Sequence, residues 1–254
     1  VKMRAVAELN MDAAKTLAEA FGVEARTVEG LLGADNIDVV VNLTIPEAHF
    51  AVTRSILEAG KHAYSEKPEV LSLEDGAALR ALAKTAGVRV GSAPDTFLGG
   101  AHQLARHAVD AGRIGRVHGG TAHFMSAGME HWHPNPDFFF KPGGGPMLDM
   151  GPYYITNMDQ LLGPVRRVVA LPGAAHDTRT ITSEPRAGET ITVETPTSIH
   201  ALLEFVGGAT VTVSTSWDVC AHGHAHIELY GTEGTLFLPD PNLFGGSVEI
   251  GLQR

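Results

Sequence analysis

The segment Ser65-Glu66-Lys67-Pro68 is the part of the sequence that most directly suggests chemistry. It follows a run, Lys61 to Tyr64, that is typical of a buried strand. Open α/β sheets bind ligands at the carboxyl ends of their parallel strands, where this lysine would lie. Pro68 has a fixed φ and restricts the residue before it, so Lys67 would leave the strand in a defined direction. A turn without any functional role could also follow a strand with these residues. The surrounding elements are needed to distinguish a ligand-binding lysine from such a turn.

A second group of residues surrounds a glycine turn, Gly143-Gly144-Gly145, which is followed by Asp149 and Tyr153. The apolar sequence up to Leu162 predicts a helix ending at Gly163. Because Pro152 is tolerated only in the first turn, Asp149 is expected at or near the amino end, where unpaired N–H groups stabilise a carboxylate. Tyr153, four residues later, is expected on roughly the same face. A helix cap and a packed aromatic ring would be the alternative.

The proline-rich loop His131 to Pro136 carries a tryptophan between two histidines. Trp132 and His133 suit stacking on a cyclic substrate and hydrogen bonding to its hydroxyls. The alternative is a surface loop held in shape by its prolines.

Three histidines, His222, His224 and His226, alternate as they would on one face of a strand. This spacing is compatible with zinc, but no nearby carboxylate or cysteine has ligand spacing, and Cys220 alone is poor support. We therefore expect structural or solvent-facing histidines and no metal site.

The first part of the chain alternates short apolar strands with helices, which predicts a doubly wound parallel sheet. We expect a helix over Met11–Phe21, capped by Asn10 and ended by Gly22. A second helix would run from Pro46 to Gly60, and a third would begin after Ser72 and end at Gly87. The expected strands are Arg4–Ala7, Ile37–Leu43, Lys61–Tyr64 and Val88–Gly91.

Glu8 ends the first of these strands, in the position of the acidic residue that binds the adenosine ribose hydroxyls in dinucleotide-binding folds. Its charge would repel a 2′-phosphate, so we expect NAD, with NADP possible. Such a fold should open with a strand and a Gly-x-Gly-x-x-Gly turn, which this sequence lacks. We expect the natural protein to begin about 25 residues earlier, because a sheet without its central strand would expose two strand edges. The alternative is a protein that has lost its phosphate-binding turn.

After Ala93 the pattern changes to one helix, Gly99–Ala111, followed mainly by strands. Thr197–Phe205 and Ala209–Trp217 flank Gly207-Gly208, a strong hairpin signal. His226–Tyr230 and Thr235–Leu238 form a second expected hairpin. The sequence therefore predicts a dinucleotide-binding domain over residues 1–97, and an α+β domain with a large, mostly antiparallel open sheet over 98–254.

Composition excludes several other classes of protein. The 254 residues are 44% hydrophobic, enough for a sizeable core. Twenty-nine acidic and 19 basic side chains give a net charge of −10 without a basic stripe, so we expect no nucleic-acid partner. No apolar run approaches the ~20 residues that span a bilayer. With one cysteine, the composition favours a reducing compartment, and we expect a cytoplasmic protein that does not bind membranes.

Taken together, these residues resemble the glucose-fructose oxidoreductase, inositol dehydrogenase and MocA (Gfo/Idh/MocA) family of NAD(P)-dependent oxidoreductases. The resemblance covers essentially the whole chain. It rests on Ala5-Val6-Ala7-Glu8, Thr44-Ile45-Pro46 with His49, Glu58-Ala59-Gly60-Lys61-His62, Glu66-Lys67-Pro68, Gly112-Arg113-Ile114-Gly115 and the glycine turn up to Asp149.

The resemblance implies a nicotinamide-binding Rossmann domain, a substrate-binding domain with an open sheet, and a homodimer or homotetramer formed through that sheet. It implies that Glu8, Thr44, Ile45, Pro46, His49, Glu66 and Lys67 contact the cofactor. The family's lysine acts in proton transfer and its aspartate helps to hold the substrate, which assigns these roles to Lys67 and Asp149. Many members have a histidine where this chain has Tyr153.

The expected reaction is hydride transfer between nicotinamide and a small-molecule substrate, namely a sugar, cyclitol or related polyol. Lys67 can act as the acid or base if burial and the positive charge of oxidised nicotinamide lower its pKa from about 10.4 toward about 7 to 8. Asp149 would orient the substrate hydroxyl, and Tyr153 would hydrogen-bond to it or relay a proton. Two alternatives are a non-catalytic dinucleotide sensor and a metal-dependent hydrolase using the histidine-rich loops.

Overall fold

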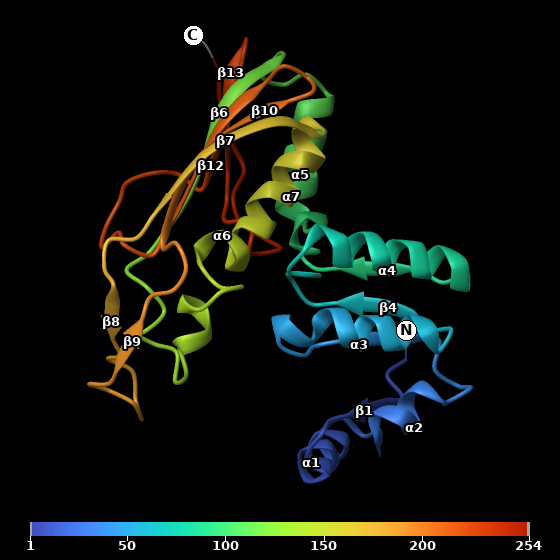
Figure 1. Ribbon diagram of the computed structural model, residues 1–254. Coiled ribbons are helices and arrows are strands. Elements are labelled where there is room, and N and C mark those ends of the chain that lie inside the picture. Colours follow the sequence, from blue (N-terminus) through green and yellow to red (C-terminus); the bar gives the residue numbers. More distant parts are fainter. Residues whose placement is uncertain (1, 253–254) are drawn as a thin grey trace. The chain divides into compact units, whose positions relative to one another are not determined.

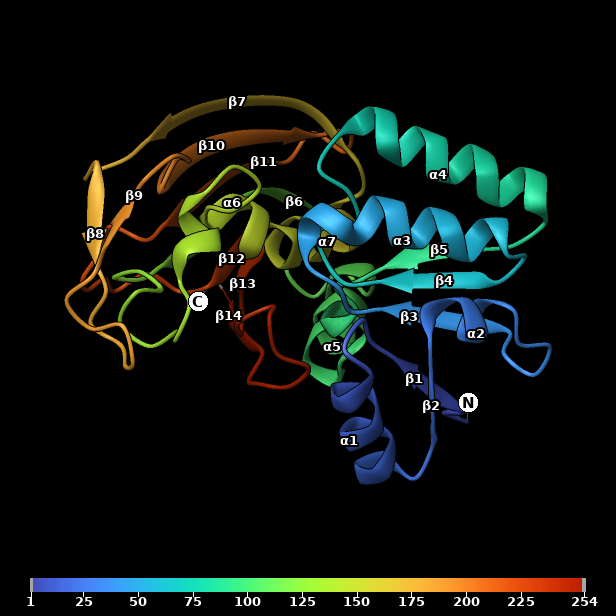
Figure 2. The same ribbon diagram turned by 60° about the horizontal axis from the view of Figure 1, so that its bottom comes forward.

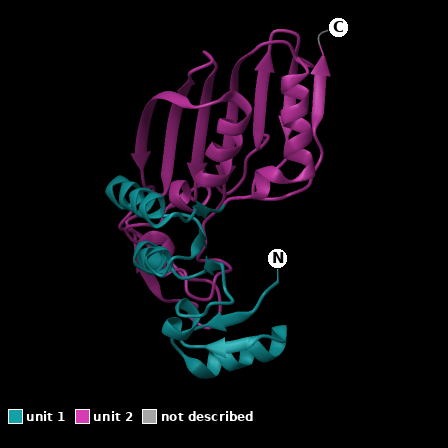
Figure 3. Ribbon diagram, turned by 90° about the vertical axis from the view of Figure 1, so that its right-hand side faces the viewer, with its two compact units in different colours: residues 1–93 teal, residues 94–254 magenta. Residues whose placement is uncertain are grey.

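The computed structural model describes residues 2–252. By their internal contacts, residues 1–93 and 94–254 form two compact units, where the sequence placed the boundary after Phe97 (Figure 3).

Unit 1 consists of βα repeats in which every pair of neighbouring strands is parallel. Strands β1 and β2 form one sheet, and β3, β4 and β5, in that order, form another (Figures 1 and 2). The strands are β1 (Ala5–Ala7), β2 (Glu24–Arg26), β3 (Val39–Asn42), β4 (His62–Ser65) and β5 (Val90–Ser92), and the helices are α1 (Met11–Phe21), α2 (Val28–Leu32), α3 (Pro46–Glu58) and α4 (Leu73–Ala86). The predicted parallel α/β architecture is confirmed.

The ends of the helices in unit 1 follow from local sequence. The Asn10 side chain accepts hydrogen bonds from the amides of Asp12 (3.0 Å) and Ala13 (3.3 Å), and Gly22 ends α1 at a φ of +64°. Ser72 accepts from the Asp75 amide (3.1 Å) at the start of α4. These contacts satisfy N–H groups that a first helical turn leaves unpaired, so the predicted caps of α1 and α4 are confirmed.

Two apolar clusters hold unit 1 together. The larger one lies between the β3-β4-β5 sheet and helices α3 and α4, and it consists of Ile56, Leu57, Ala63, Leu79 and Ala83. The smaller one, Leu31, Ala34 and Ile37, packs against residues of both β1 and β3. Apolar packing therefore connects the two parallel sheets.

Unit 2 is built on a seven-stranded sheet in the order β14-β13-β12-β6-β11-β10-β7. The β6–β11 pair is parallel and the other pairs are antiparallel, which confirms the predicted sheet. Its strands are β6 (Val117–Met125), β7 (Val165–Gly173), β10 (Ser198–Phe205), β11 (Thr210–Ser216), β12 (Ile227–Gly231), β13 (Gly234–Leu238) and β14 (Glu249–Leu252). Strands β8 (Thr178–Thr180) and β9 (Thr190–Thr192) form a separate small hairpin.

Helices α5 (Gly100–Asp110), α6 (Pro146–Asp149) and α7 (Gly151–Leu162) pack against one face of the large sheet. Figure 3 shows helices of unit 2 in front of this face. Ala105 from α5 and Tyr154 and Met158 from α7 are fully buried against sheet residues such as Val211 and Leu229. On the opposite face, Leu202 of β10 is 48% exposed and its cross-strand partner Val169 is 64% exposed.

The segment with alternating histidines differs from the sequence-based expectation. His222 and His224 lie in an irregular connection between β11 and β12, and β12 begins at Ile227. In place of strand pairing, the ring of His224 stacks on that of His123 in β6, with their centroids 4.1 Å apart. The expected alternation on one strand face is therefore wrong.

Candidate active site

Lys67 is the second residue after the carboxyl end of β4, the central strand of its sheet. Hydrogen bonds continue past β4, because the Glu66 amide donates to the Asn42 carbonyl (2.9 Å). The Glu66 carboxylate accepts from the amide of Lys67 (2.9 Å), and the Lys67–Pro68 peptide bond is cis. Lys67 is partly buried. The sheet and the Glu66 side chain thus hold the backbone that enters this lysine.

His49 joins the chain segments that leave β3 and β4. It is 1% exposed, with Nε2 2.8 Å from the Thr44 carbonyl oxygen and Nδ1 2.5 Å from the Pro68 carbonyl oxygen. Depending on its protonation, the imidazole donates to one or both of these carbonyls. His49 therefore brings Thr44 and the Glu66-Lys67-Pro68 segment together, as expected of neighbouring parallel strands.

Asn42, at the end of β3, is a positioning residue that the sequence reasoning missed. Its side chain donates to the His49 carbonyl (3.2 Å) and to Thr53 Oγ1 (3.0 Å). Its oxygen accepts from the Thr44 amide (3.2 Å) and hydroxyl (2.7 Å). The sequence signal for this role was an asparagine at the end of an apolar run. A polar side chain buried there must find hydrogen-bond partners in neighbouring segments.

The remaining predicted cofactor residues of unit 1 lie at strand ends. Pro46 occupies the first turn of α3, and Ile45 before it is 65% exposed. Glu8 is exposed after β1, and its carboxylate accepts from the Leu9 amide (3.0 Å). Glu8 belongs to the β1-β2 sheet, whereas the group around His49 belongs to the β3-β4-β5 sheet.

The Asp149 position differs in detail from the prediction. Asp149 is the last residue of the short helix α6, and α7 begins at Gly151. Pro152 lacks an N–H and cannot continue the ladder of α6, so the chain starts a new helix. Asp149 and Tyr153 therefore do not share one helix, and the argument from i, i+4 spacing is wrong for this pair. Tyr153 is partly buried in the first turn of α7 and packs against the main core of unit 2.

The glycine turn before α6 is required by close backbone contacts. A Cβ on Gly144 would lie 2.4 Å from the Phe139 carbonyl oxygen, and Gly145 has a φ of +89°. The amide of Gly145 donates to Phe139 (2.8 Å) and that of Asp149 to Gly145 (3.0 Å). The turn therefore fixes the backbone position of Asp149 relative to the phenylalanines that precede it.

The Trp132 loop, which we define as residues 126–136, carries an exposed ring beside a second apolar cluster of unit 2. This cluster consists of Met129, Phe139, Phe140, Ile181, Ile191 and Trp217. Trp132 is 63% exposed, and its ring lies 5.4 Å from that of His133. His133 in turn lies 5.4 Å from the ring of Phe138, which is 45% exposed. Phe138 was missed, although three consecutive phenylalanines, Phe138 to Phe140, marked an aromatic segment. These rings can contact a cyclic ligand.

Two titratable groups near the predicted residues have altered pKa values. Burial raises the pKa of Glu69, two residues after Lys67. Burial, and secondarily the Asp240 carboxylate, raise the pKa of Tyr154, whose hydroxyl lies 2.8 Å from His226 Nδ1. Tyr154 is fully buried and stays protonated. It belongs to the core of unit 2 that α7 packs against, whereas its neighbour Tyr153 is only partly buried.

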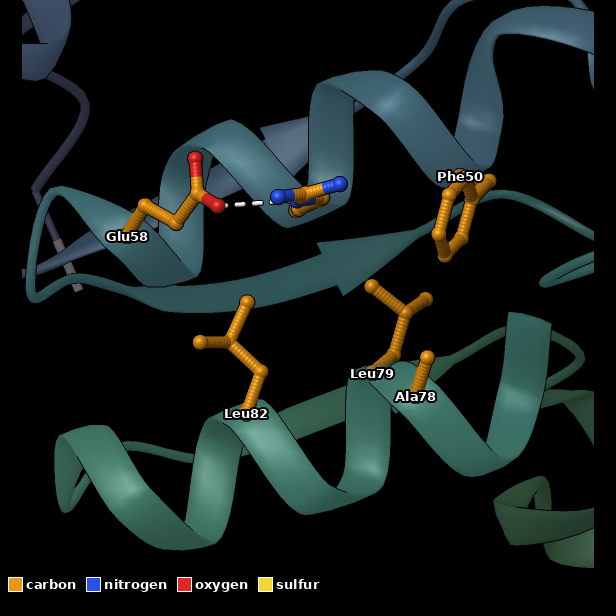
Figure 4. A pocket seen from close by; sticks show the side chains of 6 residues that line it. Phe50, Glu58, Ala78, Leu79 and Leu82 are labelled. Atoms are coloured by element: carbon orange, nitrogen blue, oxygen red, sulfur yellow. Dashed lines mark hydrogen bonds and ion pairs between the residues drawn. The ribbon is translucent and has the colours of Figure 1, made fainter. Parts of the chain in front are cut away.

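A surface hollow between α3 and α4 lies away from these residues. Figure 4 shows its lining, with an ion pair between Arg54 and Glu58 (2.8 Å) on one side. The lining residues are Phe50, Arg54, Glu58, Ala78, Leu79 and Leu82. None of the predicted site residues is among them.

Within residues 2–252, no three histidine, cysteine, aspartate or glutamate side chains are grouped so that they could hold a metal ion. Over the same range, no helix combines the length and the apolar character needed to cross a membrane.

Comparison with known proteins identifies the family. Residues 1–93 match the oxidoreductase family with an NAD-binding Rossmann fold, and residues 102–237 match the GFO/IDH/MocA C-terminal domain. A dTDP-3,4-didehydro-2,6-dideoxy-alpha-D-glucose 3-reductase from Streptomyces violaceoruber is 31% identical over 242 residues, which are 92% of this chain and 64% of the relative. A 1,5-anhydro-D-fructose reductase from Ensifer adhaerens is 32% identical over 132 residues, 51% of this chain and 39% of the relative.

Solved structures show the same fold. An NAD binding oxidoreductase from Klebsiella pneumoniae superimposes with a TM-score of 0.84 at 23% identity, over 98% of this chain and 66% of that one. A levoglucosan dehydrogenase in complex with NADH and L-sorbose gives 0.78 at 23% identity, over 92% and 63%. The chain spans less than two thirds of the two curated relatives. The resemblance inferred from the sequence is confirmed, and the chain belongs to the Gfo/Idh/MocA family of oxidoreductases, with the family's NAD-binding Rossmann domain at residues 1–93.

Proposed function

We propose that this protein is a dehydrogenase or reductase that transfers a hydride between NAD and a carbon of a sugar, cyclitol or related polyol, with NADP as a possible cofactor. The observation that carries the proposal is the placement of Lys67. Lys67 lies just past the end of a central parallel strand, and the carbonyl of the next residue, Pro68, contacts His49, which also contacts the Thr44 carbonyl. Ligands of open α/β sheets bind at such strand ends.

The residues of unit 1 fit a dinucleotide. Leu43 and Ile45, at the end of β3, are 72% and 65% exposed, which gives an apolar surface for a planar ring, and Thr44 between them is anchored by Asn42. Glu8 offers an exposed carboxylate for ribose hydroxyls at the end of β1. In this proposal Pro46, His49 and Glu66 shape the same surface. When bound, the nicotinamide supplies or accepts the hydride.

In this proposal, residues of the chain transfer the proton of the substrate hydroxyl. Oxidation of an alcohol leaves a proton on oxygen, which neutral Lys67 would accept, and in the reducing direction the ammonium of Lys67 would donate it back. We assign Asp149 to holding and orienting the substrate hydroxyl and Tyr153 to hydrogen bonding or proton relay.

The substrate class is inferred from the aromatic rings and from relatives. Trp132 and His133 would stack on a ring and bond to its hydroxyls. Besides the two sugar reductases, an inositol 2-dehydrogenase from Rhizobium meliloti is 26% identical over 92% of this chain. We propose a cyclic polyhydroxylated substrate for this chain on that basis.

We further propose a cytoplasmic homodimer or homotetramer without nucleic-acid or membrane partners. The exposed side chains of Val169, Leu171 and Leu202 on the open face of the large sheet support association of identical chains.

The test is a fluorescence titration of the full natural protein with NADH and NADPH, followed by a screen of sugars and polyols for turnover. Saturable NADH binding with turnover of a cyclic polyol is the expected result. Binding without any turnover would favour a dinucleotide sensor instead. Absence of binding, together with a zinc-dependent hydrolytic activity, would favour a metal-dependent hydrolase.

A further inference from the structure

Arg179, in the small hairpin β8–β9, has a largely buried guanidinium that forms hydrogen bonds and ion pairs with several segments of unit 2. Its side chain is 10% exposed, and one nitrogen donates to Glu130 Oε1 (2.9 Å) and to the Ala127 carbonyl (3.3 Å). A second nitrogen donates to the Trp217 carbonyl (2.8 Å) and pairs with the Asp218 carboxylate. One guanidinium therefore connects β8 with the Trp132 loop and with the segment after β11.

The Trp132 loop is shaped around the carboxylate that Arg179 binds. Glu130 is 2% exposed, and its backbone carbonyl accepts from the amides of Thr182 (3.0 Å) and Ser183 (3.2 Å). Gly128 has a φ of +116°, and a Cβ there would lie 2.2 Å from Glu130 Oε2. The loop backbone thus takes a conformation that leaves space for this buried carboxylate.

The segment after β8 also holds the two residues on either side of Trp132. The hydroxyl of Thr182 lies 2.9 Å from His131 Nδ1. The hydroxyl of Ser183 donates to the His133 carbonyl (2.6 Å). Trp132 between them is 63% exposed. The segment after β8 therefore holds the side chain of His131 and the backbone of His133, on either side of a residue that remains open to solvent.

We propose that Arg179 and Ser183 are positioning residues that hold Trp132 and His133 in the geometry needed to bind the substrate ring; this rests on the proposed function. A loop ordered before binding loses less conformational freedom when the ligand arrives, so its anchoring raises substrate affinity. The anchors lie about 50 residues from Trp132 in the sequence. Ser183 holds its neighbour His133, and Arg179 holds Ala127 and Glu130 earlier in the loop. In this proposal they act on substrate binding and leave proton transfer unchanged.

The test compares full-length Ser183→Ala, Arg179→Lys and Arg179→Gln with wild type, and Arg167→Gln is the matched control. Arg167 is an exposed β7 arginine paired with Glu204 (2.7 Å). Loss of one hydrogen bond changes a binding constant by about 2- to 10-fold. We therefore expect Ser183→Ala to raise KM for the substrate by about that factor, with kcat and NADH affinity unchanged. Arg179→Gln should raise KM further, and Arg179→Lys should restore part of the loss because it keeps the charge.

Amide hydrogen exchange gives a readout that does not depend on activity. The variants of Arg179 and Ser183 should exchange faster over residues 127–133 than wild type, whereas Arg167→Gln should not. Unchanged exchange and unchanged KM in folded Ser183→Ala and Arg179→Lys would overturn the proposal, as would an equal KM increase in Arg167→Gln. Wild-type protein that turns over no sugar or polyol would overturn the proposed function, and the exchange data would still report separately whether the anchors hold the loop.

Discussion

Lys67 and His49 illustrate how a few side chains define the candidate site in unit 1. His49 contacts carbonyls of Thr44 and Pro68, so the peptide that follows Lys67 is tied to the end of β3. Asn42 holds Thr44 and the backbone of His49 in turn. The lysine is thus supported by a set of buried polar contacts, and the contribution of its amine can be tested by itself.

Replacement of Lys67 by alanine should abolish most of the turnover and leave cofactor binding intact. A positioned acid or base contributes about 10²- to 10⁴-fold to the rate, so kcat should fall by a factor in that range while the Kd for NADH stays the same. Steady-state kinetics and NADH fluorescence measure the two quantities. Lys84→Ala, on the exposed side of α4, is the control. Full turnover in Lys67→Ala would refute the assignment.

His123 should make the stability of unit 2 sensitive to acid. Burial, and then the neighbouring His224 and His222, lower its pKa from 6.5. The groups facing it are His224, His222, His200 and Glu228. Because the folded state resists protonation, the unfolded chain takes up this proton first, and stability present above pH 6.5 should be lost as the pH falls below it.

Urea unfolding at several pH values measures this effect. His123→Gln should flatten the decrease of the unfolding free energy below neutral pH, while His118→Gln, exposed on the same strand, should not. An identical pH profile in His123→Gln and wild type would contradict the prediction.

At the scale of elements, Lys61 connects the segment after α2 to the start of β4. It is 8% exposed, and its Nζ donates to the carbonyls of Ala34 (2.7 Å) and Ile37 (2.8 Å). Those residues belong to the small core that joins the two parallel sheets. The hydrogen bonds to these two carbonyls offset the cost of burying the Lys61 amine.

Lys61→Met should therefore destabilise unit 1. The substitution removes the Lys61 donor from both carbonyls and leaves the Ala34 carbonyl with only a long bond from the Ile37 amide (3.4 Å). A buried group that loses its partner costs about 1 to 3 kcal/mol in unfolding free energy. Chemical denaturation followed by circular dichroism measures the change. Lys84→Met is the matched control and should shift stability by less than about 0.5 kcal/mol. Equal stabilities of the two variants would show that the Lys61 contacts contribute nothing.

The elements themselves were largely predictable. Helix α1 has the predicted bounds because Asn10 and Gly22 act within four residues of the helix ends. The hairpin of β10 and β11 follows from Gly207-Gly208 and the alternation around it. The alternation of His222 and His224 was mispredicted because these residues lie in an irregular connection, where the ring of His224 stacks on that of His123.

At the scale of the whole molecule, assembly should depend on the open face of the seven-stranded sheet. Leu202→Glu places a charge beside exposed Val169, so it should disfavour burial of this face against a second copy. Light scattering of the wild type should give a dimer or tetramer, and the variant should shift toward monomer. Leu73→Glu, 89% exposed on α4, is the control. A monomeric wild type would contradict the proposal.

The sequence by itself determined the element order, the caps, the parallel and antiparallel sheets, and the family, because these depend on local patterns and on short motifs. It also identified Lys67 as the candidate acid or base. Tertiary structure decided that Asp149 ends a separate helix and that Arg179 binds Glu130 and Asp218, 49 and 39 residues away. Such contacts depend on the path of the whole chain and on which buried polar groups must find partners, and no local pattern carries that information.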